Sequence, residues 1–464
     1  MKTLEPTNGF LEAHPDYEAT GKLDRLRAAD YARLDAQGQV YLDYTGAGLH
    51  GDSQVAKHAA LLRERLLGNP HSLSPASDAA TALVAETRRA VLDFFRASQD
   101  EYLAIFTPNA TAALKLVGEA FPFAEGDTYL LTFDNHNSVN GIREFARARR
   151  ARTIYAPLTL PELRIDEAVL SRELDRTGPG GHRLFAYPAQ SNFSGVQHDL
   201  RWIERAQALG WTVLLDAAAF VPTNRLDLSA CHPDFVTISF YKMFGYPTGV
   251  GALLARKPAL ARLRRPWFAG GTITVASVQG DRHYLAEGES AFEDGTLNFL
   301  NIPAVKIGLE HLEAVGLDTI HQRVRCLIRW LIDQLLALRH GNGRPLVKLY
   351  GPAGSVARGG AVAVNFFDPA GQVIDHRVIE REAGRRRISL RTGCFCNPGA
   401  GEIGLGLSPD EIKRCLPTSE EHLSLEDFGL CLGREPGAVR ASLGIVSNLA
   451  DVEAYLEFAR GLLQ

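Results

Sequence analysis

Seven short apolar runs, each about as long as a β-strand, constrain the fold of this chain more than any other feature. They read YLAIFTPN, TYLLTF, RTIYAPL, RLFAYPA, WTVLLDA, DFVTISF and GVGALLAR, and they lie between residues 102 and 256. Helix-forming segments separate them. Apolar strands that alternate with helices are typical of an α/β domain. The sequence therefore predicts a large domain built on a mostly parallel, seven-stranded sheet.

The pattern changes after about residue 300. A long amphipathic helix over roughly 317–339 leads to the shorter apolar segments LVKLYG, AVAVNFF, RISLRTG and AVRASLG. Short strands interleaved with helices favour a smaller α+β domain, and we expect the first 45 residues to pack with it. The predicted division is a large domain over 46–300 and a small domain over 1–45 and 301–464.

Composition and charge exclude some classes of function. The chain has 464 residues, of which 45% are hydrophobic and 22% are charged, so it can bury a core of the size that enzymes have. A net charge of −4 gives no basic surface for nucleic acid or for an anionic membrane. The N-terminus shows no basic region followed by an apolar run, and no apolar stretch is long enough to cross a bilayer. We expect a cytoplasmic protein that acts on a small molecule, with no nucleic-acid or membrane partner.

Polar residues follow several of the predicted strands. In open α/β sheets, ligands collect beyond the carboxyl ends of the strands. Ala110 and Thr111 begin a helix after the first strand, where free N–H groups and a hydroxyl suit a phosphate. An ordinary helix cap is the alternative. His136 follows the second strand, and Gln190 and Asn192 follow the fourth, although each alone is more often a loop hydrogen-bonding residue.

Two ionisable residues complete this set. Asp216 directly follows WTVLL, where an unpaired carboxylate would be costly, so it needs a partner unless it simply caps a helix. Lys242 lies in SFYKMFGYPTG, between a strand end and a turn rich in Gly and Pro. A partly desolvated lysine can attack a carbonyl. Pyridoxal 5'-phosphate requires such a lysine, an acid for its ring nitrogen, a flat side chain over the ring and a helix start for its phosphate.

Eight motifs in a fixed order carry a resemblance to a known family. They are VYLDYTGAGL, GNPHS, SNFSG, LLDAAAFVPT, SFYKMFGYPTGVGAL, FEDGTLNFLNIPA, RTGCFCNPGA and VRASLG. The chain resembles the class V aminotransferase and cysteine desulfurase family of pyridoxal-phosphate enzymes, most closely the desulfurase-like domain of the molybdenum cofactor sulfurases. This resemblance implies the fold type I of pyridoxal-phosphate-dependent transferases and a homodimer with a shared active site.

The resemblance also implies roles for single residues. Lys242 would form the Schiff base with the cofactor, Asp216 would pair with the pyridine nitrogen, and His136 would stack on the ring. Gln190 and Asn192 would lie beside the ring. The implied phosphate contacts are Ala110, Thr111, Ser239, Tyr241 and, from the other subunit, Thr296.

Arg440 in VRASLG would bind the substrate α-carboxylate, a role that suits a planar and permanently charged side chain. Asn192 would also lie near the substrate. The alternative is that Arg440 pairs with a structural acid.

The cysteines in RTGCFCNPGA bear on the reaction. The family spacing puts the nucleophile at Cys396, and Cys394 is a helper near the substrate or a rival nucleophile. Both can also be incidental thiols, or ligands of a metal together with Cys415 and Cys431. That last pair lies far away without tight spacing, so we predict no metal site. Six cysteines are too few for a disulfide framework in a chain of this size, and we expect free thiols.

These features predict a cysteine desulfurase-like enzyme. It would move sulfur from L-cysteine through a persulfide on Cys396 to an acceptor protein or cofactor and release L-alanine. The alternative is a carbon–sulfur lyase, aminotransferase or epimerase of class V in which Cys396 is a spectator, and a third is a non-catalytic sulfur-relay subunit. Ala219 stands where many general desulfurases have glutamine. Full-length sulfurases continue into a domain that binds the molybdenum cofactor, so a separate acceptor or another substrate is expected here.

Overall fold

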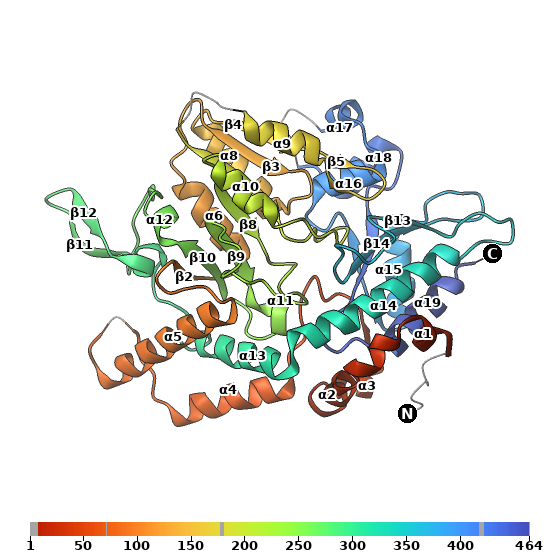
Figure 1. Ribbon diagram of the computed structural model, residues 1–464, viewed down its shortest axis with the longest axis horizontal. Helices are drawn as coiled ribbons and strands as arrows, with labels where there is room; N and C mark the ends of the chain where they lie inside the picture. The colour runs from red at the N-terminus through yellow and green to blue at the C-terminus, as the bar shows by residue number, and fades with distance from the viewer. Residues whose placement is uncertain (1–7, 71, 177–180, 417–421, 464) are drawn as a thin grey trace.

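A seven-stranded sheet forms the centre of the molecule (Figure 1). The computed structural model describes residues 8–70, 72–176, 181–416 and 422–463. The strands lie in the order β2 (Tyr102–Thr107), β10 (Gly251–Arg256), β9 (Phe235–Ser239), β8 (Thr212–Asp216), β7 (Arg183–Pro188), β3 (Thr128–Thr132) and β4 (Arg152–Ala156). β10 runs antiparallel to both of its neighbours, and the remaining pairs are parallel. The seven predicted strands and the mostly parallel sheet are confirmed.

Both faces of this sheet are covered, which explains why its strands are apolar throughout. Successive residues of a strand point to opposite faces. Leu184 and Leu214 belong to the cluster that packs on helices α6 (Ala110–Ala120) and α8 (Ile142–Ala148). Their neighbours Phe185 and Val213 belong to the cluster that includes α5 (Pro75–Phe94) and α10 (Arg201–Ala208).

The remaining elements of this part surround the sheet. Its helices are α4 (Asp52–Glu64), α5 (Pro75–Phe94), α6 (Ala110–Ala120), α7 (Asn137–Asn140), α8 (Ile142–Ala148), α9 (Glu167–Asp175), α10 (Arg201–Ala208), α11 (Phe240–Phe244), α12 (Lys257–Leu260), η2 (Gly288–Phe292) and α13 (Ile302–Val315). Two small hairpins join β5 (Leu158–Thr159) to β6 (Arg164–Ile165) and β11 (Ile273–Ser277) to β12 (Arg282–Leu285). The second hairpin projects from the end of the molecule opposite the chain termini (Figure 1).

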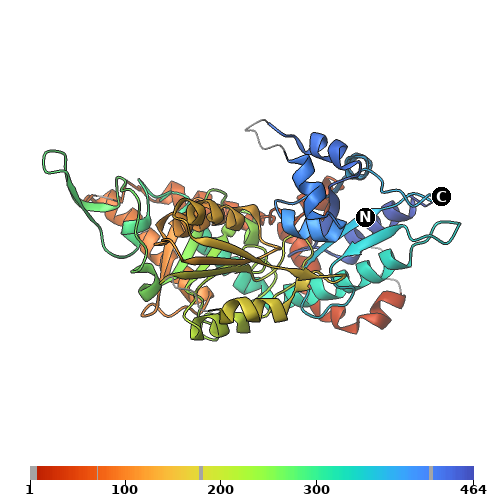
Figure 2. The same ribbon diagram turned by 90° about the horizontal axis from the view of Figure 1, so that it is seen from above.

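A smaller antiparallel sheet lies beside the large one (Figure 2). Its order is β13 (Val347–Tyr350), β14 (Ala361–Phe366), β17 (Ala438–Ser442) and β16 (Arg391–Gly393). Its helices are α14 (Leu317–Ala337), α15 (His376–Arg385), α16 (Pro398–Leu405), α17 (Pro409–Cys415), α18 (Leu425–Leu432) and α19 (Leu449–Arg460). α14 is the predicted amphipathic helix, so the smaller α+β part is confirmed. No helix among the described residues combines the length and apolar composition needed to cross a membrane.

The N-terminal segment contacts this smaller part. It contains α1 (Asn8–Ala13), η1 (Pro15–Thr20), α2 (Lys22–Asp30), α3 (Arg33–Ala36) and β1 (Val40–Tyr41), and β1 pairs in parallel with β15 (Ile388–Ser389). The buried guanidinium of Arg323 on α14 binds the Asp24 carboxylate, with Nη2 and Oδ2 2.6 Å apart. α13 packs against α4 and α5, and the exact division at residue 300 stays a prediction.

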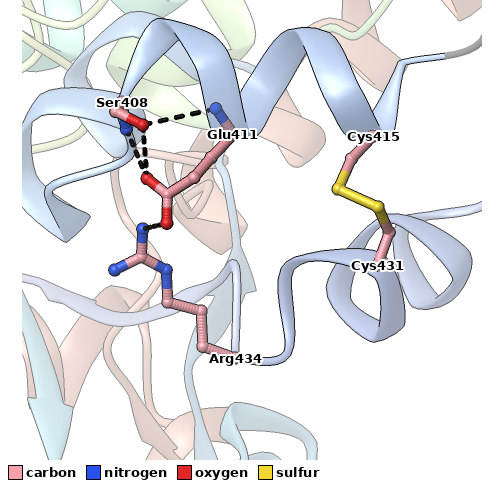
Figure 3. Close-up of a disulfide and its surroundings, with 5 residues drawn as sticks. All are labelled: Ser408, Glu411, Cys415, Cys431 and Arg434. Carbon is pink, nitrogen blue, oxygen red and sulfur yellow. Dashed lines mark hydrogen bonds and ion pairs between the residues drawn. A yellow bond between two sulfur atoms is a disulfide. The ribbon is translucent and has the colours of Figure 1, made fainter.

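The expectation that all cysteines are free is wrong for two of them (Figure 3). Cys415 at the end of α17 and Cys431 in α18 form a disulfide, with Cα atoms 5.6 Å apart. Glu411 of the same helix pair binds Arg434 at 2.9 Å. The number of cysteines could not show this, because the pairing depends on how two short helices stack. The disulfide also removes two thiols from the four-cysteine metal site considered above.

Candidate active site

A cavity of about 150 Å³ lies at the carboxyl ends of β7, β8 and β9. Nine of the ten residues predicted to hold the cofactor line it: Ala110, Thr111, His136, Gln190, Asn192, Asp216, Ser239, Tyr241 and Lys242. Thr296, the tenth, does not line this cavity and lies beside a second one near Trp267. The structure thus brings together residues that are separated by more than a hundred positions in the sequence.

Lys242 is held by a sharp turn after β9. Gly245 has a φ of 76°, and a Cβ atom there would lie 2.9 Å from the Cα atom of Leu49, so the turn requires glycine. The Lys242 amine has no hydrogen-bond or ion-pair partner among the described residues. Burial lowers the pKa of Lys242, and the charge of Asp216 opposes this shift. A lowered pKa makes the neutral, nucleophilic amine more available.

Asp216 keeps one oxygen free for a ligand. Its Oδ1 accepts hydrogen bonds from the Ala218 N–H at 3.0 Å and from the Thr237 hydroxyl at 3.4 Å. Oδ2 has no hydrogen-bond partner within the described part of the chain, and the residue lines the cavity. No helix begins after Asp216 in the described residues 217–234, so the helix-capping alternative is wrong. Oδ1 is bound within a turn, and Oδ2 fits a protonated ring nitrogen.

His136 presents a neutral ring to the cavity. Its Nδ1 accepts a hydrogen bond from the Ser138 N–H at 3.1 Å, so the ring proton is on Nε2. Burial lowers the pKa of His136, although Asp216 raises it. Ser138 also lies 2.8 Å from the Thr111 hydroxyl. Ser138 has no predicted role, although it lies two residues after His136 in the sequence.

The start of α6 offers donors for a phosphate. Asn109 accepts a hydrogen bond from the Ala112 N–H at 3.0 Å, and Ser239 accepts one from the Ala110 N–H at 2.9 Å. The Thr111 N–H has no backbone partner among the described residues. An unpartnered N–H, a hydroxyl and the positive end of the helix dipole suit a phosphate, so this cavity fits pyridoxal phosphate.

Asn192 connects the cavity to the turn that carries the candidate nucleophile. Its Nδ2 donates to the Phe395 carbonyl at 2.7 Å, and its Oδ1 accepts from the Asn397 side chain at 2.9 Å. Asn192, which is predicted to lie beside the cofactor ring, therefore also supports this turn. Gln190 is fixed separately, since its Nε2 donates to the Ala219 carbonyl at 2.9 Å.

The turn between β16 and α16 contains Cys394, Phe395 and Cys396. Cys396 is exposed and Cys394 is half-buried. Phe395 and Cys396 have φ angles of 55° and 54°, in the left-handed region that costs a non-glycine residue about 1–2 kcal/mol. The Asn137 N–H donates to the Cys396 carbonyl at 2.7 Å, and Asn397 donates to the Asp134 carbonyl at 2.7 Å. Hydrogen bonds thus hold a strained turn next to the cavity.

Arg440 is buried between this turn and the N-terminal segment. Its Nη1 donates to the Asn192 carbonyl at 2.8 Å, its Nη2 lies 3.0 Å from Asp43, and its guanidinium lies 4.8 Å from the Phe395 ring centre. The pairing with a structural acid, considered above as an alternative, is therefore present. Burial lowers the pKa of Arg440, Asp43 raises it, and a thiolate at Cys396 would also raise it.

Comparison with known proteins identifies the family. The model described as aminotransferase class V matches residues 40–455. The chain belongs to the class V aminotransferase family. The molybdenum cofactor sulfurases of Bos taurus and Solanum lycopersicum are each 38% identical to it, over 94% of this chain and over 51% and 56% of their own lengths. The chain thus spans about half the length of the curated relatives it matches.

A solved structure supports the same fold for this class V family member. The apo cysteine desulfurase of Thermococcus onnurineus NA1 has a TM-score of 0.76 and 23% identity, and the match covers 95% of this chain and 97% of that one. The predicted resemblance and the predicted fold type I are therefore confirmed. Sequence reasoning missed Asp43, Ser138 and Asn397, although each lies within a stretch of sequence that had drawn attention.

Proposed function

We propose that this class V protein binds pyridoxal phosphate and takes sulfur from L-cysteine through a persulfide on Cys396, releasing L-alanine. The bound cofactor would supply an electron sink for the substrate carbons. The observation that carries the proposal is the placement of Cys396. It is exposed, it lies on a turn bonded to the cavity residue Asn192, and its charge would affect the pKa values of Lys242 and Arg440.

Each side chain has a task in this reaction. Asp216 holds a proton on the ring nitrogen, His136 covers the ring, and Arg440 binds the substrate carboxylate. Lys242, with its lowered pKa, moves a proton to and from the substrate Cα. The Cys396 thiolate attacks the substrate sulfur, so an S–S bond forms while the Cβ–S bond of the substrate breaks. The electron pair from that bond stays on the substrate carbon, which takes up a proton to give alanine.

The experiment is a product assay with matched variants. Wild-type protein loaded with pyridoxal phosphate is given L-cysteine and dithiothreitol, and sulfide, alanine and pyruvate are quantified. We expect equal amounts of sulfide and alanine from wild type and neither from Cys396→Ser. Cys394→Ser tests the rival thiol, and Cys231→Ser, which changes a thiol outside the cavity, is the control. Pyruvate or an oxo acid without alanine, or an unimpaired Cys396→Ser, would instead support a lyase or transaminase.

The acceptor of the sulfur is proposed to be a separate protein or a cofactor. The names of the curated relatives suggest a molybdenum cofactor. Transfer is tested by incubating the protein, carrying ³⁵S from labelled cysteine, with a candidate acceptor and following the label. Label that leaves Cys396 only on reduction would argue against that acceptor.

We also propose a homodimer in which Thr296 completes the phosphate site of the partner subunit. Two observations support it. Thr296 lies beside a cavity of about 320 Å³ that is separate from the cavity with Lys242 in its own chain. Trp267, which also lines that cavity, is 51% exposed, as expected for an aromatic side chain at an interface. Sedimentation velocity tests the dimer, and a monomer at micromolar concentration would refute it. The cytoplasmic location expected from the sequence stays a prediction.

A further inference from the structure

Asp43 occupies an unusual position between two arginines. Arg391 on β16 and Arg440 on β17 are direct partners across the small sheet. Like charges placed directly opposite each other destabilise a sheet. Asp43 resolves this conflict, because its Oδ1 lies 3.0 Å from Arg440 and its Oδ2 lies 2.6 Å from Arg391. The Arg440 side chain is 3% exposed and that of Arg391 is 52% exposed, so the three charges run from the site to the surface.

The motif that contains Asp43 is shaped around this carboxylate. A Cβ atom on Gly46 would lie 2.5 Å from Asp43 Oδ2 and 2.8 Å from Arg391 Nη2. Tyr41 donates its hydroxyl hydrogen to the Ala47 carbonyl at 3.0 Å and fixes the same turn. Glycine at position 46 therefore leaves the room that the bridging carboxylate and the arginine need. This explains the aspartate and the first glycine of the motif VYLDYTGAGL.

The charges of this cluster do not cancel. Two guanidinium groups and one carboxylate leave one positive charge. The buried Nε of Arg440 also has no hydrogen-bond partner among the described residues. One positive charge and one buried donor match a ligand with a single carboxylate, since each further negative charge would be left without a counter-charge.

We propose that Asp43 is a positioning and specificity-determining residue that sets the charge of the carboxylate site to plus one and thereby selects amino acids with one carboxylate. This inference rests on the proposed function in one respect, namely that Arg440 binds the substrate carboxylate. Asp43 acts through the two arginines and does not itself contact the substrate.

Three variants change the charge in a graded way. The net charge of Asp43, Arg391 and Arg440 together becomes plus two in Asp43→Asn and zero in Arg391→Gln. In the double variant it returns to plus one. The measurement is isothermal titration calorimetry of the holoprotein with L-alanine and with L-aspartate, and the readout is the ratio of the two dissociation constants. We expect Asp43→Asn to shift this ratio toward aspartate by about tenfold or more, Arg391→Gln to shift it toward alanine, and the double variant to lie within about threefold of wild type.

If the role of Asp43 is merely structural, its loss weakens the binding of both ligands by the same factor and leaves the ratio of dissociation constants unchanged. This result overturns the inference. If Asp43→Asn does not fold, Arg391→Gln still tests the inference, because replacing a half-exposed side chain leaves the protein folded. An unchanged ratio of dissociation constants in Arg391→Gln also overturns the inference. The two proposals fail separately. Ratios that follow the charge in a protein that makes no alanine from cysteine refute the desulfurase reaction alone, and desulfuration with ratios indifferent to charge refutes the role of Asp43 alone.

Discussion

Asn397→Ala tests whether the strained cysteine turn is held in place by a balance of small energies. The Asn397 side chain donates to the Asp134 carbonyl and to Asn192, and it accepts from the Ala400 N–H at 3.2 Å. At about 1 kcal/mol for each buried hydrogen bond, the substitution removes about 3 kcal/mol. The left-handed conformations of Phe395 and Cys396 cost about 2–4 kcal/mol together.

The remaining supports are too weak to hold the turn alone. After the substitution, the bonds from Asn192 to Phe395 and from Asn137 to Cys396 contribute about 2 kcal/mol. This stabilisation is no larger than the strain energy of Phe395 and Cys396. The observed conformation of the turn therefore changes from the major to a minor population. We expect the rate of alanine formation to fall about tenfold, since each 1.4 kcal/mol changes a population about tenfold. Cofactor absorbance should persist, because Asn397 does not line the cavity.

Two measurements check this outcome. The first is steady-state alanine formation, and the second is the rate at which iodoacetamide alkylates Cys396, followed by peptide mass spectrometry. The matched control is Asn448→Ala, which also removes a helix cap, on α19, but has no contact with the cysteine turn. The reasoning is refuted if Asn397→Ala turns over at the wild-type rate, or if Asn448→Ala slows turnover as much.

Three further predictions concern stability. Replacing Cys415 and Cys431 together by serine should destabilise the helix pair α17–α18 by about 3 kcal/mol. Hydrogen exchange in helices α17 and α18 should then be faster, with turnover unchanged. Burial lowers the pKa of His136 below 6.5, so the unfolded chain binds its proton first and stability should fall as the pH drops below about 6.5. Urea unfolding from about pH 5 to pH 8 measures how the free energy of unfolding depends on pH. This dependence should be weaker in His136→Gln than in wild type, and an equal dependence would contradict the prediction. Gly46→Ala should cost about 1–3 kcal/mol by displacing Asp43, which thermal unfolding would show; an unchanged melting temperature would contradict it.

The large sheet could be predicted because its signal is local. Each strand is buried on both faces, so each appears in the sequence as a continuous apolar run bounded by polar residues. The order of the strands and the single antiparallel strand β10 depend on pairings between distant segments. Neither the order nor the antiparallel strand was predicted, because the lengths of the apolar runs carry no information on which strands pair.

The cavity residues could be predicted for a related reason. His136, Gln190, Asn192 and Asp216 each stand just after a strand, and the carboxyl ends of parallel strands meet at one edge. The roles of these residues within the site were harder to predict. The side chain of Asn192 is shared between the cavity and the cysteine turn, which lies about two hundred positions later in the chain.

Asp43 shows why the rest of the site could not be predicted. Its partners lie 348 and 397 positions away, and the charge conflict that it resolves exists only because β16 and β17 pair in the register that sets Arg391 opposite Arg440. An aspartate in VYLDYTGAGL has no local feature that distinguishes it from a solvent-exposed or capping residue. The specific role of Asp43 depends on the two arginines around it, and these come from two other segments of the chain. Residues whose function depends on long-range register are therefore the ones that sequence reasoning misses, even when it identifies the motif that holds them.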